Sequence, residues 1–155
     1  MTREILFRGK RSDNGEWARG YYVRLHSDKG RETHRIFTGY AETDCEDYYP
    51  DWFDVDPVTV GQYTGLADKN GKLIFEGDII AKPLEEDRSP WEENCTYYEN
   101  GEVYFDIERY GWYVKFPDDE ISLWEFDECG VEIVGNIYDN PKLQIKRGAQ
   151  GNDIE

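Results

Sequence analysis

The sequence predicts a mainly β protein with little helix, and three observations support this fold class. Apolar and polar residues alternate along several short segments, such as residues 17–25, as in strands that bury one face. Turn-forming sequences such as Asn-Gly separate these segments. No long segment of the 155 residues has the apolar i, i+3, i+4, i+7 spacing of an amphipathic helix.

Residues 1–57 are expected to form an N-terminal antiparallel β meander that ends in an acidic, aromatic connector. The first strand contains Ile5 and Phe7, and the Asn14-Gly15 turn leads into residues 17–25. Both residues of an Asn-Gly pair tolerate positive φ, which makes the pair a strong hairpin signal. A second turn at Asp28-Lys29-Gly30 then leads into residues 33–40.

The connector, residues 42–56, differs from the rest of this half in its composition. It carries seven acids, no base and four large aromatic residues. Because its apolar residues follow neither a strand nor a helix period, we expect a loop or a short helical turn.

Residues 58–145 are expected to form a second β region, and residues 146–155 a flexible tail. Short strand candidates follow one another, separated by turn signals at Asn70-Gly71 and Asn100-Gly101 and by a long loop at residues 82–100. Five short strands around one long loop can close into a small barrel, which removes exposed sheet edges.

The charge distribution bears on the class of partner. The formal net charge of −16 repels nucleic-acid phosphates and anionic lipid headgroups, so we expect neither a nucleic acid nor a membrane as partner. Residues 3–35 are an exception, with nine bases against five acids. Opposed patches of this kind either drive head-to-tail self-association or balance each other within the monomer, and both alternatives stay open.

The cysteines and the apolar segments bear on location. Cys45, Cys95 and Cys129 lie far apart and are odd in number, which favours reduced thiols and a cytoplasmic protein. The first ten residues are too poor in apolar residues for a signal peptide, and no apolar run reaches the roughly 20 residues that span a membrane.

Three segments resemble the YopX family of phage and prophage proteins. Residues 3–10 (REILFRGK) resemble the start of that family, residues 62–79 (QYTGL, DKNGK and FEGDI) its central signature, and residues 132–141 (EIVGNIYDNP) its closing motif. The resemblance implies a phage or prophage origin, a bacterial host cytoplasm and an SH3-like form for the small barrel. It implies no activity, cofactor or catalytic residue.

The residues of these motifs are expected to have structural roles. Gly77 permits a bend or bulge before the next strand, and Gly135 suits a position that another backbone approaches closely. Asp78 and Asn136 can accept hydrogen bonds from nearby backbone amides.

Several residues are candidates for catalysis or metal binding. Carboxylate runs at residues 118–120 and 127–128, and the pair Asp54 and Asp56, could ligate a divalent cation, but none fits a calcium-loop pattern and a solvated surface is the favoured reading. His26 and His34 are distant in sequence from the cysteines, and no nucleotide-binding glycine loop is present. We therefore predict no catalytic residue, no metal site and no cofactor.

The leading hypothesis is a non-enzymatic accessory protein that binds a protein partner, with a host factor as one candidate. Aromatic anchors inside an acidic rim suit a basic partner, although the same aromatics could turn inward and leave only the acids at the surface. A DNA mimic that inhibits a nucleic-acid-binding protein and a cation-dependent hydrolase or nuclease are the alternatives. The candidate partner-binding residues are Tyr48, Tyr49, Trp52, Phe53, Trp91, Glu92, Tyr97 and Tyr98.

Overall fold

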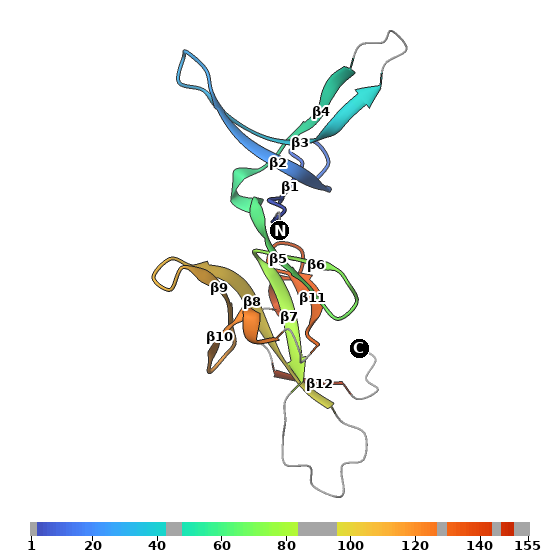
Figure 1. Cartoon of the computed structure of the whole chain (residues 1–155), viewed down its shortest axis with the longest axis vertical. Coiled ribbons are helices and arrows are strands. Elements are labelled where there is room, and N and C mark those ends of the chain that lie inside the picture. Colours follow the sequence, from blue (N-terminus) through green and yellow to red (C-terminus); the bar gives the residue numbers. More distant parts are fainter. Residues whose placement is uncertain (1–2, 43–47, 84–95, 127–129, 144–146, 151–155) are drawn as a thin grey trace, which may run out of the picture. The chain divides into compact units, whose positions relative to one another are not determined.

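The computed structural model describes residues 3–42, 48–83, 96–126, 130–143 and 147–150 (Figure 1). These residues form twelve β-strands and three short 3-10 helices, and the strands make two antiparallel sheets. The chain divides into two compact units, Met1–Gly65 and Leu66–Glu155. The prediction of a mainly β fold with little helix is confirmed.

The first sheet has the strand order β4-β3-β2-β1-β5-β6. Its first four strands follow one another as an antiparallel meander, with Gly15 and Gly30 at φ of 72° in the first two turns. Its strands are β1 (Phe7–Lys10), β2 (Trp17–His26), β3 (Glu32–Glu42), β4 (Tyr48–Asp54), β5 (Gly61–Ala67) and β6 (Leu73–Phe75), and the 3-10 helix η1 (Pro57–Thr59) precedes β5.

Strand β4 shows that the prediction of a loop or short helical turn in residues 42–56 is wrong for residues 48–54, while residues 43–47 lie outside the described residues. It pairs with β3 through Phe37↔Trp52 and Gly39↔Asp51, with a bulge between the two pairs. Aromatic residues favour strands, and Pro50 is tolerated because β4 lies at the edge of the sheet. The strand period is hidden in the sequence because large aromatic side chains occupy both faces of β4.

The second sheet has the strand order β10-β9-β8-β7-β11, and β12 also pairs with β8. Residues 147–150, which the sequence assigns to a flexible tail, form β12. The elements are β7 (Asp78–Pro83), β8 (Thr96–Asp106), β9 (Gly111–Lys115), β10 (Glu120–Ser122), η2 (Leu123–Phe126), β11 (Glu132–Asn136), η3 (Pro141–Leu143) and β12 (Arg147–Gln150).

The expected SH3-like barrel of residues 58–145 is not formed. Strand β5 pairs with β1, where Phe7 lies opposite Gln62, and therefore belongs to the first sheet. In the described part of the second sheet, β10 and β11 lie at opposite ends of the strand order, so the sheet is open. The chain that follows β10 forms η2, whose buried Leu123 and Phe126 pack into the core instead of continuing a strand.

The Asn100-Gly101 pair is also not a turn. Both residues lie inside β8, and Gly101 pairs with Ile80 of β7. A Cβ atom at Gly101 would lie 2.5 Å from Val114 Cγ1 and 2.7 Å from the ring of Phe116. The glycine is therefore required by close packing within the sheet rather than by positive φ.

Each unit has its own apolar core. In Leu66–Glu155, a large cluster that includes Ile80, Val103 and Val114 fills one face of the second sheet. In Met1–Gly65, a small cluster of Ala18, Ile36 and Val55 lies on one face of the meander. No helix in the described part of the chain is long and apolar enough to cross a bilayer.

Candidate functional site

Three aromatic side chains form a row across β2, β3 and β4. The strand register places Tyr21 opposite Phe37, and Phe37 opposite Trp52. Residues directly opposite each other in antiparallel strands project from the same face of the sheet. We call Tyr21, Phe37 and Trp52 the aromatic row.

The row lies on the face of the sheet that the small core does not use. Ala18 and Tyr22 of β2 contact the core, and side chains alternate along a strand, so Tyr21 points to the opposite face. Tyr21 is 65% exposed, Trp52 is 38% exposed and Phe37 is partly buried. Singly exposed apolar residues are ordinary, whereas three aligned aromatic rings form a patch that needs an explanation.

An arginine fixes the position of Trp52. The guanidinium of Arg35 lies 3.8 Å from the centre of the Trp52 ring, at cation–π distance. Its Nε donates a hydrogen bond of 2.9 Å to Oδ1 of Asp54, the next residue on the same face of β4. The ion pair holds the guanidinium in place, so Trp52 has a set orientation before any partner arrives.

A groove lies between strand β4 and the β1–β2 turn, and Trp52 is the residue of the aromatic row that lines it. It has a volume of about 430 Å³ and is lined by Ser12, Asp13, Trp52, Phe53 and Asp54. The Ser12 amide donates a hydrogen bond of 2.9 Å to the Asp54 carbonyl oxygen, so the groove lies where the β1–β2 turn meets β4.

Arg11 holds the second aromatic side chain of the groove. Its guanidinium lies 3.9 Å from the Phe53 ring centre and binds both carboxylate oxygens of Asp13, at 2.9 and 2.6 Å. This hydrogen-bonded pairing with Arg11 lowers the pKa of Asp13. The groove therefore presents two aspartates, each already oriented by an arginine.

The core face of the hairpin formed by β2 and β3 carries a polar network. The hydroxyl of Tyr22 lies 2.5 Å from Nδ1 of His34, and Nε2 of His34 lies 3.0 Å from a carboxylate oxygen of Glu32. Arg24 binds the same carboxylate, and this pairing lowers the pKa of Glu32. The network joins β2 to β3 and gives His34 a structural role in this hairpin.

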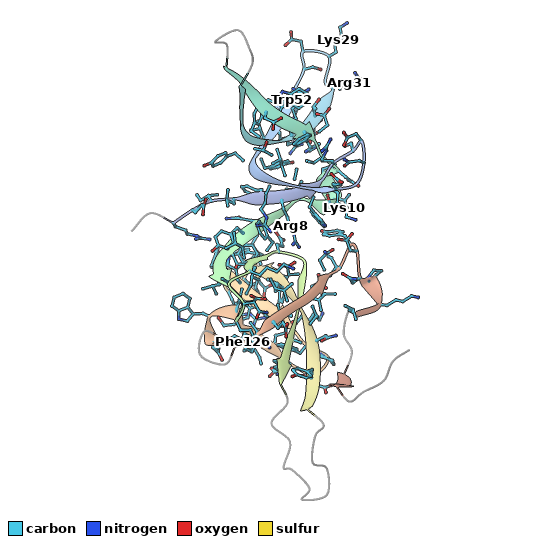
Figure 2. All side chains as sticks on the ribbon, turned by 90° about the vertical axis from the view of Figure 1, so that its right-hand side faces the viewer. Arg8, Lys10, Lys29, Arg31, Trp52 and Phe126 are labelled. Carbon is cyan, nitrogen blue, oxygen red and sulfur yellow. The ribbon has the colours of Figure 1, made fainter. Side chains whose placement is uncertain are left out.

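The tip of the β2–β3 hairpin carries basic residues, whereas the residues that line the groove include two aspartates. Figure 2 shows Lys29 and Arg31 at the tip of this hairpin, and Trp52 on β4. All nine bases of Met1–Gly65 lie between residues 3 and 35, whereas residues 42–56 hold seven acids and no base. In the sequence, the excess of bases therefore ends before β4.

The candidate residues taken from the sequence fall in both units. Trp52 and Phe53 line the groove together but project from opposite faces of β4, and Tyr48 and Tyr49 lie in the same strand. Tyr97 and Tyr98 belong to β8, where Tyr98 is partly buried. Trp91 and Glu92 lie outside the described residues.

Sequence reasoning missed two of the three residues of the row. Tyr21 and Phe37 are ordinary strand residues in the sequence, and no acidic segment draws attention to them. Their alignment with Trp52 follows only from the register of three strands, which depends on recognising β4 as a strand.

The carboxylate runs weighed as cation sites have other partners. Asp119 accepts a hydrogen bond from the Glu120 amide, and Glu120 binds Arg109. Asp56 caps η1 by accepting from the Val58 amide. Within the described ranges no three His, Cys, Asp or Glu side chains come together to hold a metal ion. Residues 127 and 128 lie outside these ranges.

The residues of the central motif are part of the scaffold. Asp68 is buried, and its carboxylate accepts hydrogen bonds from the amides of Asn70, Lys72 and Ile133 at 2.9, 2.9 and 3.1 Å. Burial raises the pKa of Asp68, but the three backbone bonds together outweigh it and the net shift is downward. One carboxylate thereby joins the turn before β6 to strand β11.

The other motif residues also act on the local backbone, as expected. Asp78 accepts a hydrogen bond of 2.8 Å from the Phe75 amide, and Asn136 accepts from the amides of the two residues Tyr138 and Asp139. Gly135 differs from the expectation of a close backbone approach. A Cβ atom there would lie 2.5 Å from the side-chain oxygen of Asn140, so a side chain requires the glycine.

Comparison with known proteins identifies the family and the fold. The model of the YopX protein family matches residues 6–144. The crystal structure of protein EF1440 from Enterococcus faecalis is similar, with a TM-score of 0.57 and 22% identity over 92% of this chain and 99% of that chain. No curated protein matches. The chain belongs to the YopX family.

Proposed function

We propose that this protein is a non-enzymatic protein-binding module and that the aromatic row is its binding surface. The observation that carries the proposal is the alignment of Tyr21, Phe37 and Trp52 on the face that the small core does not use. Tyr, Trp and Arg are enriched among the residues that supply most of the binding energy at interfaces. The ion-paired Arg35 keeps Trp52 oriented, which lowers the entropy lost on binding.

The charge of the chain favours a protein over a nucleic acid as partner. Aromatic rings on a sheet can also stack bases, but a net charge of −16 opposes the approach of phosphates. In keeping with the YopX resemblance, the proposal places the module among phage or prophage accessory proteins of the bacterial cytoplasm.

Selection from a random linear peptide library tests the proposal without a known partner. Peptides enriched on the immobilised wild-type protein are then measured against the double variant Tyr21→Thr, Trp52→Thr. Threonine keeps the strand propensity of both positions. The matched control is Ile107→Thr, since Ile107 is an apolar residue that is 75% exposed and lies outside the row.

We expect the enriched peptides to bind the control like the wild-type protein and to bind the double variant at least about tenfold more weakly, because truncated anchors commonly cost more than 1 kcal/mol. Circular dichroism must show that both variants keep the β spectrum. Peptides that bind all three proteins equally, or no enrichment at all, would refute the proposed binding surface.

A further inference from the structure

We infer that the aromatic row receives a proline-rich peptide in the polyproline II conformation, with an arginine or lysine at the β4 end. This inference rests on the proposed function, because it names the partner of the same surface. Its first support is geometric. Tyr21 and Trp52 are separated by two strand spacings, since Phe37 lies between them in the register.

The length of the row matches the repeat of a polyproline II helix. Two strand spacings amount to about 9.6 Å. Three residues of polyproline II rise about 9.3 Å and return the side chain to the same face. Prolines at positions i and i+3 of a peptide that crosses the strands would therefore lie over Tyr21 and Trp52.

Other regular conformations fit the row less well. A peptide strand repeats on one face about every 6.8 Å, and a helix returns to one face at i+4 and i+7, about 6 and 10.5 Å along its axis. Polyproline II also has little conformational entropy to lose on binding, and aromatic-lined surfaces exploit this in other proline-binding modules.

The charge of the β4 end selects a basic residue beyond the prolines. The groove past Trp52 contains Asp13 and Asp54, whose side chains are 63% and 50% exposed although both bind an arginine. A carboxylate has acceptor sites for more than one donor, so each can take a further hydrogen bond from a peptide cation. Asp51, which is exposed in the same strand, adds a third carboxylate.

A second copy of this chain is a poor occupant of the row. The six prolines stand at positions 50, 57, 83, 90, 117 and 141, and no two of them are three residues apart. The ligand is therefore expected to be a segment of another protein that carries a Pro-x-x-Pro sequence followed by a base.

Nuclear magnetic resonance titration with synthetic peptides tests the inference. The probe is acetyl-Ala-Pro-Pro-Ala-Pro-Pro-Ala-Arg-Arg-amide, and the two control peptides replace either the prolines by alanine or the arginines by glutamate. With the wild-type protein we expect saturable shifts confined to the amides of β2, β3 and β4. Both control peptides should bind at least about tenfold more weakly.

The protein variants then locate the binding site. Tyr21→Thr and Trp52→Thr should each weaken binding of the proline peptide at least about tenfold, and Ile107→Thr should leave it unchanged. Equal binding by all three variants would overturn the inference. If library peptides need the row but the proline peptide does not bind, the proline inference fails and the proposed function stands. If no peptide of either kind needs the row, both fail.

Discussion

Tyr21 and Tyr22 are adjacent, chemically identical and on opposite faces of β2, so replacing each by threonine separates binding from folding. Tyr21 is 65% exposed on the aromatic row. Because threonine keeps the strand propensity and little burial is lost, Tyr21→Thr should change the free energy of unfolding by no more than about 0.5 kcal/mol.

Tyr22→Thr should be much more costly. The Tyr22 ring packs against the small core and lies 5.7 Å from the Phe7 ring, and its hydroxyl bonds to His34. Loss of a fully buried ring costs about 3–5 kcal/mol. Tyr22 is only partly buried, so about half of this is expected, together with about 1 kcal/mol for the hydrogen bond.

The sum for Tyr22→Thr is about 3 kcal/mol, which corresponds to a decrease in Tm of about 6–12 °C for a chain of this size. Urea denaturation followed by circular dichroism measures both variants, and Tyr22→Phe isolates the hydrogen bond. An equal loss of stability for Tyr21→Thr and Tyr22→Thr would mean that the aromatic row is part of the core, and the argument for a binding surface would then fail.

Two further predictions concern the scaffold of Leu66–Glu155. Asp68→Asn should destabilise the fold by about 2 kcal/mol at pH 7, because an amide cannot accept all three backbone hydrogen bonds. Because folding lowers the pKa of Asp68, the stabilisation by its carboxylate is complete above the unfolded pKa near 3.8 and disappears as the pH falls through the folded pKa. Urea denaturation that shows the same stability difference between Asp68→Asn and the wild type at pH 7 and well below pH 3.8 would contradict this. Tyr110 is 84% exposed and has a φ of 52°, which costs about 1–2 kcal/mol for a residue with a Cβ atom. The greater freedom of glycine in the unfolded chain offsets about half of this, so Tyr110→Gly should stabilise the fold by about 1 kcal/mol and raise Tm by about 2–4 °C. A lower Tm would show that the ring supports the fold.

The local signals in the sequence were sufficient for the first three strands of the meander and for the roles of Asp78 and Asn136. Asn14-Gly15 and Gly30 do form the first two turns, because these positions need a positive φ that few other residues adopt easily. Asp78 and Asn136 accept backbone hydrogen bonds as expected. In each case the structural requirement is local, so a few neighbouring residues are enough to predict it.

Features that depend on pairing between distant segments could not be predicted. Gly101 resembles a turn residue in sequence, but the reason for it is the packing of Val114 and Phe116, more than ten residues away. Likewise, the sequences of five strand candidates do not indicate which strands pair with each other. Strand β5 pairs with β1 in the first sheet and is therefore not available to close the second sheet. Trp52 could be selected from its acidic surroundings, whereas Tyr21 and Phe37 required the register.

The YopX motifs describe the scaffold of this protein rather than its ligand. The residues that carry the central and closing motifs, among them Asp68, Gly77 and Asn136, have direct roles in turns and in backbone hydrogen bonding. Folding accounts for such residues, so their presence in a family motif gives no information about binding. The informative residues are those that folding does not account for. Tyr21 exposes a large ring on the outer face of a sheet, and no part of the small core requires it there. We therefore expect a partner to bind at the aromatic row.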